Sequence, residues 1–279
     1  MKTQIKLCAA ALALVGATSA FAAGEATNVI FFLGDGMGPT TVTASRIYKY
    51  GEAGQLTMES LKRTARIKTY SLDGQTTDSA PSMAAYMTGV KMRNEVISMS
   101  ADTVARDSAN KSYTSGAHST CPAGNGSAVT TLLELAKAAG WGTGAVTTTR
   151  VTHATPAVTY AHICHRDAEN TIAAQAVPGG LGYNNALGDG LDVLLGGGRQ
   201  FFLPTASGGK RTDGRDLTAE LVTKGYTYVK TKTEFDAAAA GSTKKIVGLF
   251  TSSHMSYDLD RDPAVEPSLA EMTTKAIDI

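Results

Sequence analysis

Short apolar, β-branched runs alternate with segments of helical pattern along most of this chain, and this alternation restricts the fold more than any other feature. A parallel strand pair needs a long crossover, usually a helix, so the alternation indicates βαβ units. Continuous apolar runs are typical of strands that are buried on both faces. We therefore predict an α/β fold with a mainly parallel central sheet and helices on both faces.

The pattern also gives expected bounds for each element. Strands are predicted over residues 28–33, 65–70, 143–149, 192–195, 226–229 and 245–250. Helices are predicted over residues 39–50, 79–88, 127–139, 217–223 and 233–240. Thr155, as N-cap, and Pro156 open a further helix. The last helix follows Ser268, which has capping-box spacing to Glu271.

The start of the chain has the pattern of a secretory signal peptide. Lys2 and Lys6 flank the beginning of a run of 9 apolar residues, 7–15, which is too short to span a membrane. Small residues at Ala20 and Ala22 suit a cleavage site. We predict a signal over residues 1–22, one domain over residues 23–279 and a periplasmic or secreted location. No other stretch could span a membrane.

Composition excludes several classes of protein. A net charge of +1 with 43% hydrophobic residues is unlike a disordered tail or a basic nucleic-acid-binding domain. Three cysteines are too few for a disulfide scaffold, and Cys8 lies in the predicted signal. Cys121 and Cys164 could pair outside the cytoplasm, which would close a loop of about 40 residues and stabilise the fold by roughly 3–4 kcal/mol. The sequence leaves the pairing open.

Asp35 is the first candidate for chemistry. It follows the first predicted strand inside Gly34-Asp35-Gly36-Met37-Gly38. Ligands of open parallel sheets bind beyond the carboxyl ends of strands, and Asp is a hard oxygen ligand for metals. The alternative is a structural turn in which Asp35 caps the next helix, and the motif alone does not separate the two.

Ser79 is the second candidate, within Thr77-Asp78-Ser79-Ala80. The start of a helix offers unpaired N–H groups and the positive end of the dipole, which would stabilise an alkoxide or a phosphate. Read alone, the motif favours an ordinary helix cap, because Asp and Ser are the usual N-cap residues.

The third candidate is the segment that holds His153, His162 and Arg166. A helix from Pro156 would place His162 and Arg166 on one face, where Arg166 could bind a phosphate with its planar fork. The alternative is a surface arginine and a histidine with a structural role in the core.

These motifs belong to a longer ordered set that resembles the alkaline phosphatase family. The similarity extends from about Asn28 to Ile279. The matching motifs are Gly34 to Gly38, Thr77 to Ala80, Thr88 to Lys91, Val146 to Arg150, His153 to Ala157, Ala161-His162, Asp192 to Arg199, Gly248 to Phe250, His254-Met255, Asp260 to Asp262 and Glu266 to Leu269.

The resemblance implies an enzyme, usually dimeric, that hydrolyses phosphomonoesters with two zinc ions and one magnesium ion. It implies that Ser79 is the nucleophile that forms a phosphoserine and that Arg166 binds the phosphate oxygens. Asp35 would bridge a zinc and the magnesium, Thr155 would bind the magnesium and His153 would lie beside it. Neither a nucleic acid nor a membrane is an expected partner.

The family's other metal ligands, a Glu for magnesium and Asp and His residues for both zincs, are expected after the last predicted helix. We therefore expect the chain to be an N-terminal portion with little or no turnover by itself. One alternative is an inactive fragment. Another is a related phosphodiesterase or a sulfatase, although sulfatases need C/S-x-P-x-R and the segment from Ser79 to Met83 has the proline but no arginine.

Overall fold

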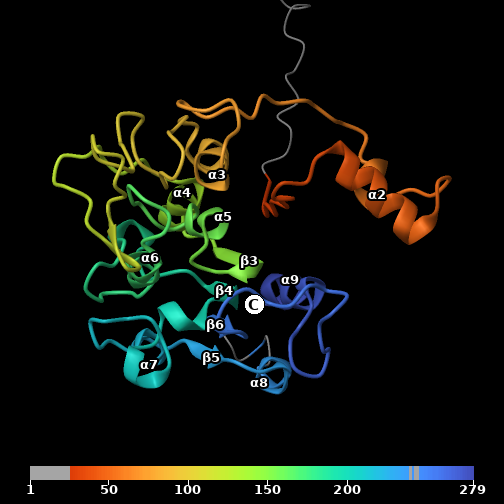
Figure 1. Cartoon of the computed structure of the whole chain (residues 1–279). Coiled ribbons are helices and arrows are strands. Elements are labelled where there is room, and N and C mark those ends of the chain that lie inside the picture. Colours follow the sequence, from red (N-terminus) through yellow and green to blue (C-terminus); the bar gives the residue numbers. More distant parts are fainter. Residues whose placement is uncertain (1–25, 239–240, 242–244) are drawn as a thin grey trace, which may run out of the picture. The chain divides into compact units, whose positions relative to one another are not determined.

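A parallel sheet of four strands, in the order β3-β4-β6-β5, forms the centre of residues 53–279 (Figure 1). The computed structural model describes residues 26–238, 241 and 245–279. All three strand pairings are parallel, as predicted. The strands are β3 (Gly144–Arg150), β4 (Val193–Gly197), β5 (Thr227–Val229) and β6 (Ile246–Leu249).

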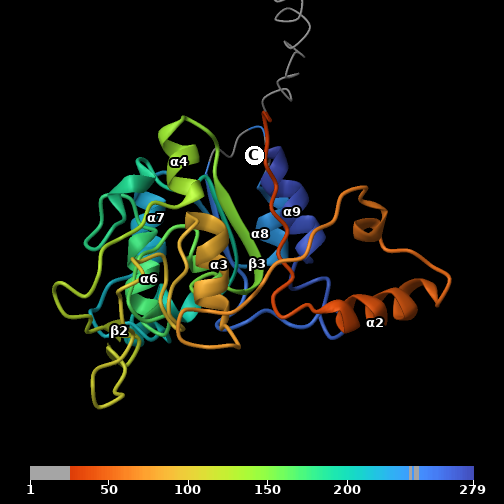
Figure 2. The same ribbon diagram turned by 90° about the horizontal axis from the view of Figure 1, so that it is seen from above.

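Helices lie on both faces of this sheet (Figure 2). The described helices of this unit are α3 (Ser79–Thr88), α4 (Leu132–Ala138), α5 (Ala154–Ala157), α6 (Glu169–Gln175), α7 (Leu217–Thr223), α8 (Lys232–Ala237) and α9 (Leu269–Asp278). Short 3-10 turns are η1 (Thr57–Ser60), η2 (Asn185–Leu187), η3 (Arg199–Phe201) and η4 (Thr205–Ser207), and β1 (Thr114–Ser115) pairs with β2 (His118–Ser119).

Each sheet face has its own apolar core because side chains alternate along a strand. On β4, Leu194 joins a core that includes residues of α3, α6 and α7. Its neighbours Val193 and Leu195 face the other core, with Phe235 of α8 and Met272 of α9. The predicted α/β fold with helices on both faces is confirmed.

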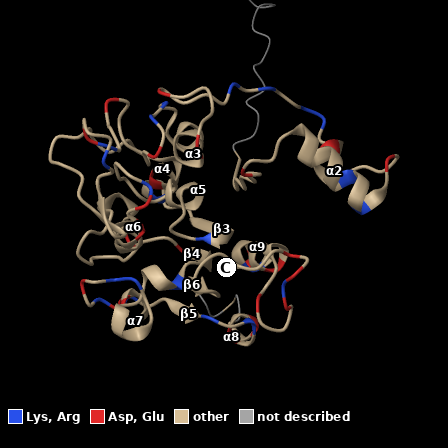
Figure 3. Ribbon diagram, in the orientation of Figure 1, with Lys and Arg blue, Asp and Glu red and all other residues tan. Residues whose placement is uncertain are grey.

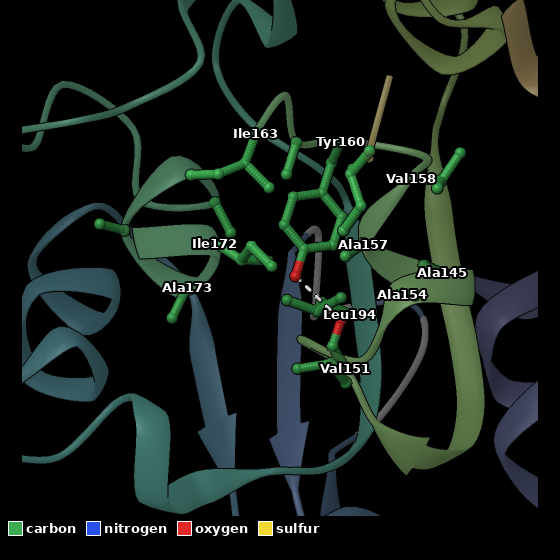
Figure 4. Close-up of a cluster of buried hydrophobic side chains, with 14 of the residues drawn as sticks. Ala145, Val151, Ala154, Ala157, Val158, Tyr160, Ile163, Ile172, Ala173 and Leu194 are labelled. Atoms are coloured by element: carbon green, nitrogen blue, oxygen red, sulfur yellow. Dashed lines mark hydrogen bonds between the residues drawn. The ribbon is translucent and has the colours of Figure 1, made fainter. Parts of the chain in front are cut away.

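Tyr160 lies inside the first core and also fixes the chain after β3 (Figure 4). Its ring is fully buried near Ile172 of α6, and its hydroxyl donates to the carbonyl of Val151 at 2.9 Å. Burial raises the pKa of this phenol, so it stays protonated. Tyr160 therefore packs the turn that precedes the candidate site.

Several helix ends follow the predicted sequence signals. α3 ends at Gly89, whose φ of 72° suits a glycine, and α7 has the predicted bounds. Ser268 and Glu271 form the predicted capping box of α9. The predicted helix 127–139 corresponds to α4, which begins at Leu132 rather than at residue 127 because Thr131 caps it. Residues 239–240 of the predicted helix 233–240 lie outside the described residues.

Two predicted strands are wrong. Residues 28–33 form no strand, and Val29 and Phe32 are 63% and 74% exposed. Residues 65–70 form none either, with Ile67 63% exposed. An apolar run becomes a strand only where a neighbour satisfies its N–H and C=O groups, and neither segment has a ladder partner among the described residues.

Residues 26–52 are the described part of a second compact unit. Helix α2 (Pro39–Tyr50) confirms the predicted helix, with Pro39 at its start and Gly51 after its end. The predicted signal over residues 1–22 lies outside the described residues. Among the described residues, every helix is too short or too polar to cross a membrane.

Candidate active site

Ser79 is the first residue of α3, directly after its N-cap, Asp78. The Asp78 Oδ1 atom accepts a hydrogen bond from the N–H of Ala80 at 2.7 Å. Within the described part of the chain, the Ser79 hydroxyl makes no hydrogen bond, and the residue is half-buried. Ser79 therefore has an accessible hydroxyl at the positive end of a ten-residue helix.

Arg166 lies in a turn, so the predicted helix from Thr155 through Arg166 is wrong. The helix there, α5, spans only Ala154–Ala157, and its N-cap is His153 rather than Thr155. Thr159 turns its hydroxyl back onto the carbonyl of Pro156, and Ile163 forms a β-bridge with Ile97. These contacts draw the chain out of helical geometry. His162 and Arg166 therefore share no helix face.

Asp78 nevertheless links Arg166 to the start of α3. The Arg166 Nη1 atom lies 3.3 Å from Asp78 Oδ1, and the Arg166 side chain is 16% exposed. Both charge signs occur in the loops around α3 (Figure 3). Ser79 and Arg166, which the sequence singled out, are thus brought together through an aspartate whose role as a link the sequence did not show.

His153 holds the other side of the same guanidinium. Arg166 Nη2 lies 3.0 Å from His153 Nε2, and because arginine has no acceptor, this ring nitrogen is the acceptor. In this conformation, Nε2 therefore holds Arg166. Thr155 follows two residues later in α5 and is half-buried.

Arg150 forms a second arginine cluster at the end of β3. Its guanidinium forms a bidentate pair with Glu169, with Nε 2.8 Å from Oε2 and Nη2 2.7 Å from Oε1. Thr152 donates to the same carboxylate at 2.6 Å. Arg150 Nη1 also lies 2.5 Å from Nε2 of His254. Burial, together with the positive charge of Arg150, lowers the pKa of His254.

The loop that carries His254 approaches the sheet because β4 ends in glycines. A Cβ on Gly197 would lie 2.2 Å from the carbonyl oxygen of Ser253. The ring of His254 then meets that of His153 edge-on, with centroids 5.3 Å apart. The lack of a side chain at Gly197, the last residue of β4, thus allows close packing beside the site.

His162 has a structural role in the core. Its Nδ1 lies 2.7 Å from the carbonyl oxygen of Ser98, and its Nε2 lies 2.6 Å from Glu134 Oε1. Burial acts against the charged ring, but the hydrogen bonds to Glu134 and Ser98 outweigh it and raise the pKa of His162. The contacts of His162 therefore support the alternative in which it has a structural role in the core.

A disulfide joins Cys121 to Cys164, with Cα atoms 6.0 Å apart. The pairing that the sequence left open is therefore present. Cys164 lies two residues before Arg166, so the bridge attaches the Arg166 segment to the residues that follow β2.

Asp35 belongs to the separate unit of residues 1–52, where it follows Gly34 in an exposed turn. Among the described residues, no three His, Cys, Asp or Glu side chains gather as a metal site requires.

Sequence reasoning missed two residues beside Arg166. The sequence of Asp78 and Ser79 is typical of a helix cap, so the capping role of Asp78 could be predicted. Its contact with Arg166 could not be predicted from the sequence. Glu95 gave no signal, because a non-glycine residue with a φ of 70° cannot be recognised in one sequence.

Comparison with known proteins identifies the family. The model of the alkaline phosphatase family matches residues 26–279. The alkaline phosphatase of Gadus morhua is 38% identical over 91% of this chain and 56% of its own length. Human tissue-nonspecific alkaline phosphatase is 35% identical over 91% of this chain and 51% of its own length.

Solved structures give the same result. Thermus thermophilus alkaline phosphatase superposes with a TM-score of 0.65 and 30% identity, over 85% of this chain and 43% of that one. The chain spans about half the length of the curated relatives it matches. Because the family model covers nearly all of the sequence, the chain belongs to the alkaline phosphatase family.

Proposed function

We propose that the complete protein hydrolyses phosphomonoesters and that this chain contributes Ser79 as nucleophile and Arg166 as phosphate ligand. The observation that carries the proposal is the link through Asp78, which caps the helix of Ser79 and lies 3.3 Å from the Arg166 guanidinium. The hydroxyl lies at the start of a helix with a planar cation held beside it. This arrangement can bind the doubly charged phosphate group of a phosphomonoester.

In the proposed reaction, the Ser79 oxygen bonds to phosphorus as the ester oxygen leaves, which gives a phosphoserine. Water then cleaves the phosphoserine and releases phosphate. Arg166 would hold the equatorial oxygens, and it would stabilise charge that develops in both steps. The partial exposure of Arg166 supports this role, because the substrate must reach the guanidinium from solvent.

We propose two zinc ions and one magnesium ion as cofactors, with Asp35, Thr155 and His153 as the candidate ligands from this chain. A mutant of the alkaline phosphatase from the Antarctic bacterium TAB5, 27% identical with a TM-score of 0.59 over 80% of this chain and 52% of that one, has Mg bound in its M3 site. We propose that residues other than these three supply the remaining ligands. Periplasmic or secreted location and a homodimer belong to the same proposal.

The test is hydrolysis of p-nitrophenyl phosphate by the protein expressed from its complete reading frame, whatever its length. We expect hydrolysis that Ser79→Ala abolishes, whereas Ser82→Ala, one turn along α3, keeps most of it. Residues 23–279 alone, with zinc and magnesium added, should show little or no turnover. Faster hydrolysis of a diester or a sulfate ester, or full activity of Ser79→Ala, would contradict the proposal.

A further inference from the structure

Asp78, Glu95 and Arg166 form a closed ring of contacts. The N–H of Glu95 donates to Asp78 Oδ2 at 2.6 Å, and the N–H of Arg166 donates to the carbonyl of Glu95 at 2.8 Å. The side chain of Arg166 closes the ring at Asp78 Oδ1. Because each residue contacts the other two, a shift of one displaces both others.

Glu95 joins this ring through its backbone, which has an uncommon conformation. Its φ is 70°, in the left-handed region that residues other than glycine rarely adopt. Such a conformation persists only where the surroundings hold it. Both backbone groups of Glu95, the N–H and the C=O, are used by the ring, so a change of φ would turn at least one of them away.

The side chain of Glu95 anchors that backbone from the opposite side. Arg106 forms a bidentate pair with it, with Nε 2.7 Å from Oε2 and Nη2 2.5 Å from Oε1. The hydrogen bond from Arg106 is the main cause that lowers the pKa of Glu95, so the carboxylate stays charged. The ion pair thus holds Glu95 at the base of the loop that carries Arg106.

We propose that Glu95 is a positioning residue for phosphoryl transfer: its left-handed backbone fixes the separation between the start of α3, which carries Ser79, and the guanidinium of Arg166. The inference rests on the proposed function and deepens it. Glu95 itself touches no substrate and acts through Asp78 and Arg166.

The surroundings of Glu95 allow substitutions that separate its backbone from its side chain. A cavity of about 500 Å³ is lined in part by Asp78, Glu95 and Arg106. Arg106 is 39% exposed, so solvent can reach its guanidinium when the Glu95 carboxylate is lost, and the buried His165, whose Nε2 lies 3.6 Å from Glu95 Oε1, loses the same neighbour in both variants. Glu95→Gly adopts a positive φ without strain, whereas Glu95→Val disfavours it strongly. Both variants remove the carboxylate, so loss of the ion pair with Arg106 does not contribute to their difference.

The experiment compares the two variants in the protein expressed from its complete reading frame. We expect Glu95→Val to raise KM for p-nitrophenyl phosphate and the inhibition constant of inorganic phosphate about tenfold or more relative to Glu95→Gly. The matched control is Glu220→Gln, because Glu220 on α7 forms a bidentate pair of the same type with Arg215, which precedes that helix. That control should keep the wild-type constants.

Each outcome decides the inference. Equal constants for Glu95→Val and Glu95→Gly in an active protein would overturn it and leave the proposed function intact. If wild-type protein hydrolyses no phosphomonoester, the proposed function fails, and amide hydrogen exchange at Arg166 decides instead. Faster exchange in Glu95→Val than in Glu95→Gly supports the inference, and equal exchange overturns it. If Glu95→Val does not fold, Glu95→Ala replaces it in the same comparison.

Discussion

Arg150 and Arg166 are two partly buried arginines that each lie beside a histidine, yet their surroundings differ. Arg150 forms a bidentate pair with both carboxylate oxygens of Glu169, whose side chain is only 8% exposed. Arg166 meets a single oxygen of Asp78 at 3.3 Å, and that side chain is 27% exposed. The first arrangement, the Arg150–Glu169 pair, stabilises the fold, and we call it the clamp. The second holds the guanidinium in place and still lets an anion approach it.

The largest expected effect concerns the clamp. Glu169→Ala leaves the Arg150 guanidinium, whose side chain is only 18% exposed, without its carboxylate, so we expect the free energy of unfolding to fall by about 3–5 kcal/mol. Urea denaturation measures this loss. The matched control is Glu220→Ala, because Glu220 is 32% exposed in its pair with Arg215, and that change should cost less than about 1 kcal/mol. Similar small losses in both variants would remove the distinction between the two arginines.

The disulfide tests how the Arg166 segment is held. Cys121 and Cys164 are 43 residues apart in sequence, and reduction should lower the free energy of unfolding by about 3–4 kcal/mol. Denaturation with and without dithiothreitol measures the difference. The double variant Cys121→Ser/Cys164→Ser should not respond to the reductant. An unchanged midpoint in the wild type would mean that the bridge does not secure this segment.

Substitution of Arg166 itself should separate activity from stability. In the protein from the complete reading frame, Arg166→Ala should lower kcat/KM about 10²–10³-fold, because a preorganised cation is lost. The free energy of unfolding should fall by less than in Glu169→Ala, because Arg166 meets a single oxygen of Asp78 rather than both oxygens of a buried carboxylate. Steady-state kinetics and urea denaturation of one preparation give both values. A large loss of stability with little loss of activity would make Arg166 a second clamp.

The smallest expected effect concerns pH, because His162 and His254 should contribute to stability with opposite pH dependence. The pKa of His162 is raised above 6.5, so its contribution to stability is full below that pH and is lost as pH rises through the folded value. Burial acts against the Glu134 carboxylate, but its hydrogen bonds, that from His162 first, lower its pKa below 4.5, so its contribution is lost as pH falls through the folded value. Their pair therefore contributes most between pH 4.5 and 6.5.

His254 should behave in the opposite way. Its pKa is lowered by burial and by Arg150, so its contribution is present above pH 6.5 and is lost as the pH falls. Unfolding free energies from pH 5 to 9 for the wild type, His162→Gln and His254→Gln check both signs. His162→Gln should lose more stability at pH 5.5 than at pH 8.5. His254→Gln should lose less stability at pH 5.5 than at pH 8.5. The same trend in both variants would contradict the assignment.

The sheet and its helices could be predicted because their signals are local. The buried strands β4 and β6 are short apolar runs, and Asp78 and Ser268 cap helices where the sequence predicts. Residues 28–33 have the same apolar pattern, but a strand depends on a partner that a single sequence does not reveal. Long-range pairing therefore set the limit of the fold prediction.

The site shows the same limit. Ser79 could be placed because its helix begins where the cap predicts, whereas Arg166 was given the wrong local structure. The turn at Arg166 depends on contacts with distant residues, such as the bridge between Ile97 and Ile163. The ring through Glu95 depends on tertiary contacts as well, so propensity alone could not have indicated it.

The most direct test of the account is to identify the residue that takes up phosphate. The protein from its complete reading frame would be incubated with a phosphomonoester, quenched in acid and digested for mass spectrometry. We predict phosphate on Ser79 in the wild type and none at this position in Ser79→Ala. Phosphate on another residue, or turnover by Ser79→Ala at the wild-type rate, would contradict the proposal that Ser79 and Arg166 form the reacting pair.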